Sequence, residues 1–185
     1  SLVINKYETE LINQNLDTEV TEDQIYDYYK NNSGEFRLNR DIVKVASVTL
    51  PKDSKRKWVF PKWIRNYDTL MVDTLTYLAN KYALEYDFNI KDWRDFEDVA
   101  NIYNLKIKDN KSFLSNKKYF VVNDDETYTL VKICEYRLVG DESPCEMETD
   151  RIKYIILTNR KKALLENLYK DLHSKAIQDN ALEVF

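Results

Sequence analysis

Apolar residues recur at helical spacing near the start of the chain, and two helices are predicted there. Over Leu2–Leu16 the apolar positions fall on one stripe of a helix, and charged residues occupy much of the remaining surface. Thr21 and Gln24 have the pattern of a capping box, in which each side chain satisfies a backbone N–H of the other residue. This box predicts the start of a second helix. The run Asn31–Gly34, whose residue types tolerate left-handed backbone, should end it.

The middle of the chain shows strand-like alternation interrupted by further helical patterns. Alternation rich in Val and Ile predicts a strand over Asp41–Leu50. Helices are predicted over Lys62–Ala83, with Leu70 and Met71 on the apolar face, and over Asp92–Tyr103. Three further strands, the last two of which should form a hairpin, are predicted over Leu105–Lys108, Tyr119–Val122 and Tyr128–Leu138.

A second capping box predicts one long helix to the end of the chain. It is formed by Ser143 and Glu146, with Pro144 at the first helical position. No helix breaker follows, so this helix should run for about 35 residues, or about 50 Å at 1.5 Å per residue. Such a helix is longer than a small domain is wide, so its far half should pack against the first two helices. The sequence therefore predicts an α+β fold, with a βααβββ domain over 39–142 inserted in a helical unit formed by 1–38 and 143–185.

Composition excludes several classes of function. The 185 residues carry a net charge of −4 and give a pI near 5.2, an acidic balance that argues against nucleic-acid binding. Gly34 and Gly140 are the only glycines, so the chain has no glycine-rich nucleotide loop and no nucleophile elbow. No apolar run is long enough for a transmembrane helix. The chain starts inside a predicted helix without a signal peptide, as expected if a targeting segment has been removed.

Few residues offer catalytic or metal-binding chemistry. His173 is the one histidine, and the sequence indicates neither a nucleophile nor an orienting acid for it, so a structural or exposed role is favoured. Cys134 and Cys145 are too few for a zinc site, and they leave open either a disulfide or, slightly favoured, two separate thiols. No pair among the 32 acidic residues stands out as a glycosidase-like pair. We therefore expect no metal and no cofactor.

Two local features are candidates for a binding surface. The run Lys52–Lys57 is the densest positive charge, and a solvated loop tip is favoured there over a phosphate or acidic-partner site. Trp58, Phe60 and Trp63 lie close together in a chain with 14 Tyr, 7 Phe and 3 Trp. Aromatic rings provide large contact areas with adaptable polar tips. Most of them should form the core, and Trp58, Phe60 and Trp63 are candidates for a surface that binds peptides.

Several strings along the chain resemble the parvulin-type peptidyl-prolyl cis-trans isomerases, and more closely the SurA-like periplasmic chaperones of Gram-negative bacteria. The runs Tyr7–Asn13 and Val20–Lys30, followed by Phe36, look like the helical segment that precedes the isomerase domain in that family. Val43–Leu50 resembles the family's first strand, and Phe96–Ala100 resembles its Phe-x-x-Leu-Ala helix. Tyr128–Ile133 resembles its last strand, and the returning C-terminal helix is resembled by Ile152–Lys161 with Leu164–Ala176.

The chain departs from this family at the catalytic positions. Ser47 stands where the first strand of the family has a histidine before Ile-Leu, and Thr129 stands where the last strand has the His of Gly-Tyr-His-Ile. The family's glycine-rich segment is also missing. Parvulins hold the twisted imide in an apolar pocket with polar groups around it, and two hydroxyls would leave only a weak network there. No catalytic residue is carried over, and the resemblance implies a degenerate isomerase domain that lacks efficient activity.

The resemblance implies a SurA-like chaperone that binds unfolded polypeptides, among them outer-membrane proteins. It also implies a location in the periplasm or at the periplasmic face of a membrane. Binding should be weak and reversible, because an unfolded client loses conformational entropy on capture. Two alternatives stay open: an active prolyl isomerase that uses Ser47 and Thr129, and a structural or assembly module that docks a partner through the long final helix.

Overall fold

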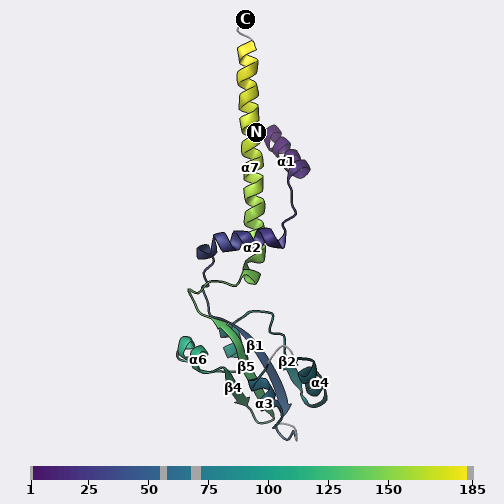
Figure 1. Ribbon diagram of the computed structural model, residues 1–185, viewed down its shortest axis with the longest axis vertical. Coiled ribbons are helices and arrows are strands. Elements are labelled where there is room, and N and C mark those ends of the chain that lie inside the picture. Colours follow the sequence, from purple (N-terminus) through teal and green to yellow (C-terminus); the bar gives the residue numbers. More distant parts are fainter. Residues whose placement is uncertain (1, 55–57, 68–71, 183–185) are drawn as a thin grey trace. The chain divides into compact units, whose positions relative to one another are not determined.

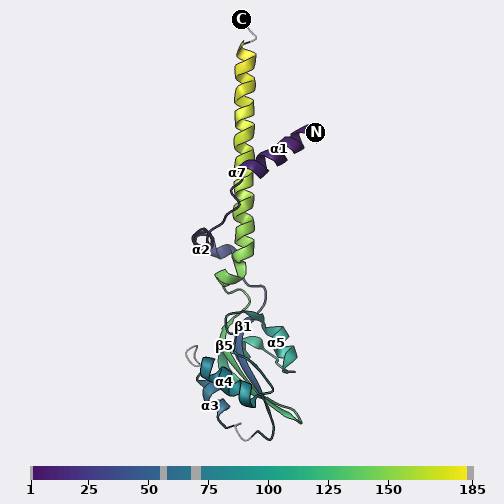
Figure 2. The ribbon, with the colours of Figure 1, turned by 90° about the vertical axis from the view of Figure 1, so that its right-hand side faces the viewer.

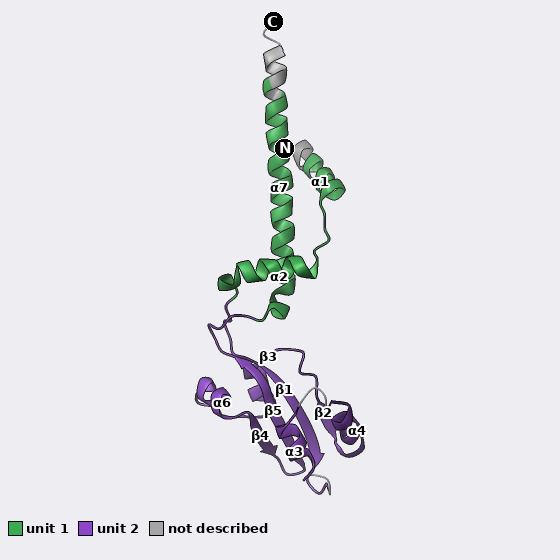
Figure 3. Cartoon of the chain, viewed as in Figure 1, with its two compact units in different colours: residues 1–36, 144–185 green, residues 37–143 purple. Residues whose placement is uncertain are grey.

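The structure, a computed structural model, describes residues 2–54, 58–67 and 72–182, with the side chains of 6–54, 58–67, 72–175 and 177. It contains helices and one antiparallel sheet, so the predicted α+β class is confirmed (Figures 1 and 2). The chain divides into two compact units (Figure 3). We call Ser1–Phe36 together with Pro144–Phe185 the helical unit, and Arg37–Ser143 the sheet unit.

Among the described residues, three helices form the helical unit, and one short 3-10 turn follows the second of them. They are α1 (Leu2–Asn15), α2 (Glu22–Asn31) and α7 (Cys145–Leu182), with the turn over Ser33–Glu35. The capping box predicted before α2 is present: Gln24 N donates to Thr21 Oγ1 over 3.3 Å, and Thr21 N donates to Gln24 Oε1 over 3.1 Å. Helix α7 has 38 residues, which confirms the predicted long final helix.

The core of the helical unit is small and aromatic. Ile25 of α2, Ile152 of α7 and Phe36 are buried and in contact. The ring of Tyr29 stacks on Phe36 with centroids 5.6 Å apart, and the Arg151 guanidinium lies 5.2 Å from the Phe36 centroid. These contacts join the end of α2 to the first turns of α7.

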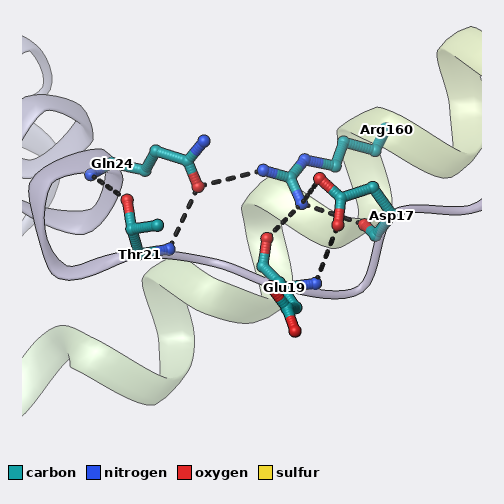
Figure 4. Close-up of polar contacts among 5 residues, drawn as sticks. All are labelled: Asp17, Glu19, Thr21, Gln24 and Arg160. Carbon is teal, nitrogen blue, oxygen red and sulfur yellow. Dashed lines mark hydrogen bonds and ion pairs between the residues drawn. The ribbon is translucent and has the colours of Figure 1, made fainter.

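One arginine of α7 holds the connection between α1 and α2 (Figure 4). Arg160 Nη1 donates to the carbonyl oxygens of Asp17 and Glu19 over 2.9 and 2.6 Å, and Nη2 donates to Gln24 Oε1 over 3.0 Å. The Asp17 carboxylate lies 3.2 Å from the same guanidinium. Because a guanidinium is planar and presents several donors at fixed angles, Arg160 orients this connection through polar contacts.

Two long strands form the centre of the sheet unit, and shorter strands flank them. The strands are β1 (Ile42–Pro51), β2 (Glu85–Asp87), β3 (Arg94–Asp95), β4 (Tyr119–Asn123) and β5 (Thr127–Arg137). Their order is β2-β1-β5-β4, with β3 also paired to β1, and every pairing is antiparallel. The structure thus confirms the three longer strands of the prediction, whereas the short β2 and β3 have no counterpart in it.

Helices cover both faces of the sheet, because successive side chains of a strand point to opposite faces (Figure 2). The helices are α3 (Phe60–Arg65), α4 (Val72–Tyr82), α5 (Phe96–Ile102) and α6 (Asn110–Asn116). On one face, Val48 and Leu130 pack with residues of α3 and α4. On the other, Val45 and Val131 pack with residues of α5 and α6.

The single helix predicted over Lys62–Ala83 is wrong, because α3 ends at Arg65 and neither Asn66 nor Tyr67 is helical, whereas α4 covers Val72–Tyr82. The side chain of Asn66 donates to a carbonyl oxygen of the last turn of α3 over 3.1 Å. Side-chain bonds of this kind compete with continued helix. Leu70 and Met71, and the end of the basic run at 55–57, lie outside the described residues.

Side-chain caps explain two further differences from the prediction. The helix predicted over Asp92–Tyr103 begins only at Phe96, because the Asp95 carboxylate accepts from a backbone N–H of the first turn over 2.9 Å. The strand predicted over Leu105–Lys108 is wrong. These residues are not paired in the sheet, and α6 follows them, started by Asp109, whose carboxylate accepts from a first-turn N–H over 3.2 Å.

Candidate functional site

Ser47 and Thr129, which replace the histidines of the parvulin pattern, lie on neighbouring central strands. Ser47 of β1 is paired with Val131 of β5, and Thr129 is paired with Thr49 of β1. Ser47 and Thr129 are therefore diagonal neighbours on one face of the sheet. Both residues are buried, with exposed fractions of 9% and 8%. The two hydroxyl groups lie on the same face but have little access to solvent.

Thr49 is a third hydroxyl residue on this face and forms a hydrogen bond with Thr129. Their Oγ1 atoms are 3.0 Å apart, and either hydroxyl can donate. The contact follows from the register, because directly opposed residues of antiparallel strands bring their side chains close together. Thr49 is not among the residues predicted for this site. Its position two residues after Ser47, on the same face of a strand, is the signal that could have identified it.

The three aromatic residues expected to contact a client differ in exposure. Trp58, just before α3, is 80% exposed. Phe60, at the start of α3, is 1% exposed and belongs to the core between this helix and the sheet. Trp63 is partly buried against the same core. Phe60 is therefore not available to a client, because its ring packs in the core, whereas Trp58 lies on the surface.

The sheet unit contains an apolar hollow of about 580 Å³ beside β2 and α4. Its aromatic and aliphatic lining consists of Tyr67, Val72, Tyr86, Phe88 and Ile90. Its polar lining consists of Thr76, Asp87, Asn89 and Lys91. Volumes of this size, lined by apolar side chains with a few polar groups, are typical of sites that accept small ligands or side chains.

Three aromatic rings form one wall of this hollow. The ring of Phe88 lies between its neighbours, with centroids 6.0 Å from Tyr67 and 5.1 Å from Tyr86. The Tyr67 hydroxyl donates to the carbonyl oxygen of Phe88 over 2.7 Å. Burial, with smaller contributions from Cys134 and Asp87, raises the pKa of Tyr67 to about 12. Tyr67 therefore keeps its proton, and this hydrogen bond, at neutral pH.

Local hydrogen bonds fix the chain segment that forms this wall. Asn89 N donates to Asp87 Oδ1 over 2.9 Å, and Lys91 N donates to Asn89 Oδ1 over 3.1 Å. The Asn89 side chain donates to Asp92 over 2.7 Å, and Arg94 forms an ion pair with Asp87. Since these bonds lie within the segment itself, they hold the wall in place, and a bound group would not have to order it.

A second hollow, of about 470 Å³, lies in the helical unit between α2 and the start of α7. Its apolar part includes Val20, Ile25 and Tyr26, and Cys145 lies at its side. Three acidic residues, one basic residue and one hydroxyl residue complete the lining: Glu22, Asp23, Glu146, Lys153 and Thr149. This hollow is more polar than the first, and its excess of carboxylates would disfavour an anionic ligand.

The cysteines and the histidine do not form a reactive centre in the described part of the chain. Cys134 in β5 and Cys145 at the start of α7 are separate thiols. Burial raises the pKa of both, and Glu146 and Glu148 add to this effect at Cys145. Such thiols are poor nucleophiles at neutral pH. His173 is exposed on α7, and no described group of three His, Cys, Asp or Glu residues is arranged to hold a metal ion.

The wall of the apolar hollow is the feature that sequence reasoning missed. Tyr86 and Phe88 stand two residues apart after a predicted helix, a spacing that indicates one face of a strand. No strand is predicted for this segment, because a strand of three residues, as β2 is, shows too little alternation to be detected. Tyr67 was expected within a continuous helix, but it lies beyond the end of α3 and reaches Phe88.

None of the helices in the described part of the chain is both long and apolar enough to cross a membrane. Models of known protein families give no match to this chain, and neither do the curated proteins. One solved structure aligns with 94% of this chain and 68% of its own length, with a TM-score of 0.35 and 11% identity. It is described as one of two structurally related SurA-like chaperones of Campylobacter jejuni, the virulence factor PEB4 and the periplasmic protein Cj1289. A TM-score of 0.35 is too low to assign a family.

Proposed function

We propose that this protein is a chaperone-like module that binds extended, apolar stretches of non-native polypeptides reversibly. The observation that carries the proposal is the preformed apolar hollow of the sheet unit, with the rings of Tyr67, Phe88 and Tyr86 in one wall. A hollow of about 580 Å³ has room for one or two large side chains of a client. Its charged residues, Asp87 and Lys91, have opposite signs, so no net charge selects the client.

The lining suits a ligand of variable sequence. Aromatic rings gain from the apolar area that they bury, and this gain does not require one particular side-chain shape. A client would lose conformational entropy on binding, which offsets part of this gain and keeps the complex weak. Trp58, with 80% of its surface exposed, and the partly buried Trp63 are proposed as additional contacts.

The type of each unit, the identity of the clients and their location are part of the same proposal, and they rest on the resemblance of the sequence to SurA-like chaperones. The sheet unit would be a degenerate parvulin-like domain, and the helical unit would be its SurA-like partner. Unfolded outer-membrane proteins in the periplasm would be the clients. Ser47 and Thr129 would not sustain efficient isomerase activity, because both hydroxyls are buried, and that of Thr129 is also hydrogen-bonded to Thr49, so they are poorly placed to stabilise a twisted imide.

A titration with a proline-containing, aromatic-rich unfolded peptide tests the binding site, with one matched pair of variants. Thr76 and Thr74 both lie on α4, but only Thr76 lines the hollow, whereas Thr74 is exposed. Thr76→Asp introduces a charge that a bound apolar side chain would have to desolvate, so affinity should fall roughly tenfold. Thr74→Asp should bind as the unaltered chain does. Equal affinities for the two variants would show that the hollow is not the binding site.

The alternative of an active isomerase is decided in the same titration by following cis/trans exchange of the peptide's X-Pro bond by NMR. A degenerate domain should bind the peptide without accelerating exchange. Acceleration that Thr129→Val and Ser47→Ala abolish, with binding retained, would establish isomerase activity and overturn this part of the proposal.

The alternative of a docking module is favoured by one observation on α7. Tyr169, Leu172 and Ile177 are each about half exposed there, so the helix presents apolar surface. Leu172→Lys separates the two functions, because it should leave peptide binding to the sheet unit unchanged. Loss of peptide binding in this variant would place the client on α7 and not in the hollow.

A further inference from the structure

The strand β4 lies at one end of the sheet, and only one of its two edges is paired. The sheet order ends with β5 and then β4, and within the described residues no strand follows on the outer side (Figure 1). A strand edge of this kind presents unpaired N–H and C=O groups, which form a template for another strand.

The hydrogen-bond pattern tells which backbone groups of β4 face outward. Ile133 N donates to Lys118 O over 3.0 Å, and Asp124 N donates to Thr127 O over 3.3 Å. The residues just before and just after β4 therefore both direct backbone groups toward β5. In an antiparallel ladder every second residue directs its N–H and C=O to the partner strand. The residues at 118, 120, 122 and 124 therefore face β5, and Tyr119, Val121 and Asn123 direct their backbone groups to the outer edge.

Charges of opposite sign flank this apolar strand. Lys117 and Lys118 precede it, and Asp124 and Asp125 follow it. All four of these residues are exposed. The strand between them has no charged residue and no proline, and its central residue Val121 is 36% exposed.

We propose that the β4 edge pairs antiparallel with the β4 edge of a second copy of this chain, with the two-fold axis at Val121. In this register Val121 lies opposite the partner's Val121, and Tyr119 lies opposite the partner's Asn123. These are the residues whose backbone groups face outward, so the two edges satisfy each other. The pairing is isologous and closes after two copies.

The same register also places both flanking lysines opposite carboxylates of the partner. Lys118 lies opposite the partner's Asp124, and Lys117 lies opposite the partner's Asp125. Each pair occurs twice because of the two-fold symmetry. A shift by two residues in one direction would place Lys117 opposite the partner's Asn123 and lose both charge pairs. A shift in the other direction would keep only one, between Lys118 and the partner's Glu126, so the register centred on Val121 has the most complementary pairs.

This charge pattern favours a second copy over an extended client strand as the occupant. An antiparallel copy always brings its acidic end to the basic end of β4, whereas an unfolded client has no fixed charges at this spacing. A single short strand pair buries less surface than a stable interface needs. The dimer should therefore be weak, depend on protein concentration, and weaken further when salt screens the exposed pairs.

Charge-reversal variants, measured alone and as a mixture, test the proposal. Dimerisation is followed by sedimentation velocity over a range of protein concentrations. Lys117→Glu and Asp125→Lys each create two like-charge contacts, so each variant alone should dimerise roughly tenfold more weakly. An equimolar mixture of the two variants should recover dimerisation, because both contacts become attractive in the mixed pair. The double variant should recover it as well. Lys106→Glu, a reversal at an exposed lysine away from β4, is the matched control and should have no effect.

Two cysteine variants test the register itself under mild oxidation. Val121→Cys should give a crosslinked dimer, because opposed residues of a hydrogen-bonded pair have Cα atoms about 5.5 Å apart, within disulfide range. Asn123→Cys should not, because its symmetry mate is four residues away along the strand, or about 14 Å. The unaltered chain under the same oxidation corrects for Cys134 and Cys145.

The outcomes that overturn the proposal are distinct. A monomer at every concentration would exclude the dimer. A dimer that all charge variants leave unchanged, or equal crosslinking of Val121→Cys and Asn123→Cys, would place the interface elsewhere. Weakened peptide binding in Val121→Pro without any dimer would show that the edge accepts clients instead. Proline is tolerated there because its missing N–H is one that faces outward.

Discussion

The two units of the chain hold their elements together by different means. The sheet unit has buried apolar residues on both faces of its sheet, such as Leu130 on one face and Phe96 on the other. The helical unit has one small cluster of Ile25, Phe36 and Ile152, and the polar contacts of Arg160 supplement it. Because hydrophobic stabilisation grows with the apolar area removed from water, we expect the sheet unit to be the more stable of the two.

The distribution of chromophores allows this difference to be measured within one chain. Trp58, Trp63 and Trp93 all belong to the sheet unit, so tryptophan fluorescence reports on it alone. The 38 residues of α7 belong to the helical unit and dominate the helical signal in circular dichroism. Unfolding followed by both probes should therefore give two transitions, with the helical signal lost first.

The largest effect is expected from Phe96→Ala, which removes a fully packed ring between α5 and the sheet. Phe96 is 1% exposed, and truncation of such a ring costs about 3–5 kcal/mol of unfolding free energy. The fluorescence transition should move to much lower urea concentration and approach or precede the helical one. Ile102→Ala, at a 67% exposed position of the same helix, is the matched control and should have little effect. An equal response to both changes would show that α5 is not packed as described.

A smaller effect is expected from Ile152→Ala in the helical unit. Ile152 is fully buried, but a small core can relax around the lost atoms, so the cost should lie near the low end for such changes, about 2 kcal/mol. The dichroism transition should shift, while the fluorescence transition stays in place. Tyr154→Ala, at a 71% exposed position of the same helix, controls for helix propensity. A parallel shift of the fluorescence transition would mean that the two units unfold together.

Local rules predict most of the elements, and the failures lie where side chains act as caps. The capping box of Thr21 and Gln24 and the long α7 follow from sequence pattern, because each depends on nearby residues only. The end of α3 at Arg65 and the start of α5 at Phe96, later than predicted, each depend on one side-chain hydrogen bond, of Asn66 and of Asp95. Hydrophobic periodicity does not indicate which polar side chain will form such a bond.

The candidate site is less predictable than the fold because distant segments form it. Tyr67 and Phe88 are 21 residues apart, and their hydrogen bond depends on how α3, α4 and β2 pack on the sheet. The sequence shows how many aromatic residues the chain has, but it does not predict which rings are buried and which are exposed. Phe60 illustrates this, because it is buried although its neighbour Trp58 is exposed.

The polar contacts of the helical unit are tested by Arg160→Met, which keeps a long side chain but removes every donor. The connection between α1 and α2 would lose its bonds to the carbonyl oxygens of Asp17 and Glu19, and we expect a cost of about 1 kcal/mol. Amide hydrogen exchange should accelerate over residues 16–21 and stay unchanged in the sheet unit. Lys161→Met removes an exposed charge from the adjacent position of α7 and should leave exchange as it is. Unchanged exchange in Arg160→Met would show that apolar packing alone orients this connection.

The smallest effect is expected from a single carboxylate of the sheet unit, and it depends on pH. Hydrogen bonds from Ser112 lower the pKa of Asp109 below its usual value of 3.8, because they favour the charged form that caps α6. A group whose pKa is lowered by folding stabilises the protein above its unfolded pKa, and this contribution is lost as the pH falls through the folded value. Asp109→Asn keeps a good capping residue that cannot titrate.

The variant should therefore lose less thermal stability than the unaltered chain when the pH is lowered from neutral to below 3.8, as followed by tryptophan fluorescence. Asp53→Asn, at an exposed position of the same unit, provides the comparison. If both variants respond to acid alike, the cap of α6 does not contribute to the acid sensitivity of the sheet unit. If only Asp109→Asn is protected, a polar cap contributes measurably even in the unit whose stability is dominated by apolar burial.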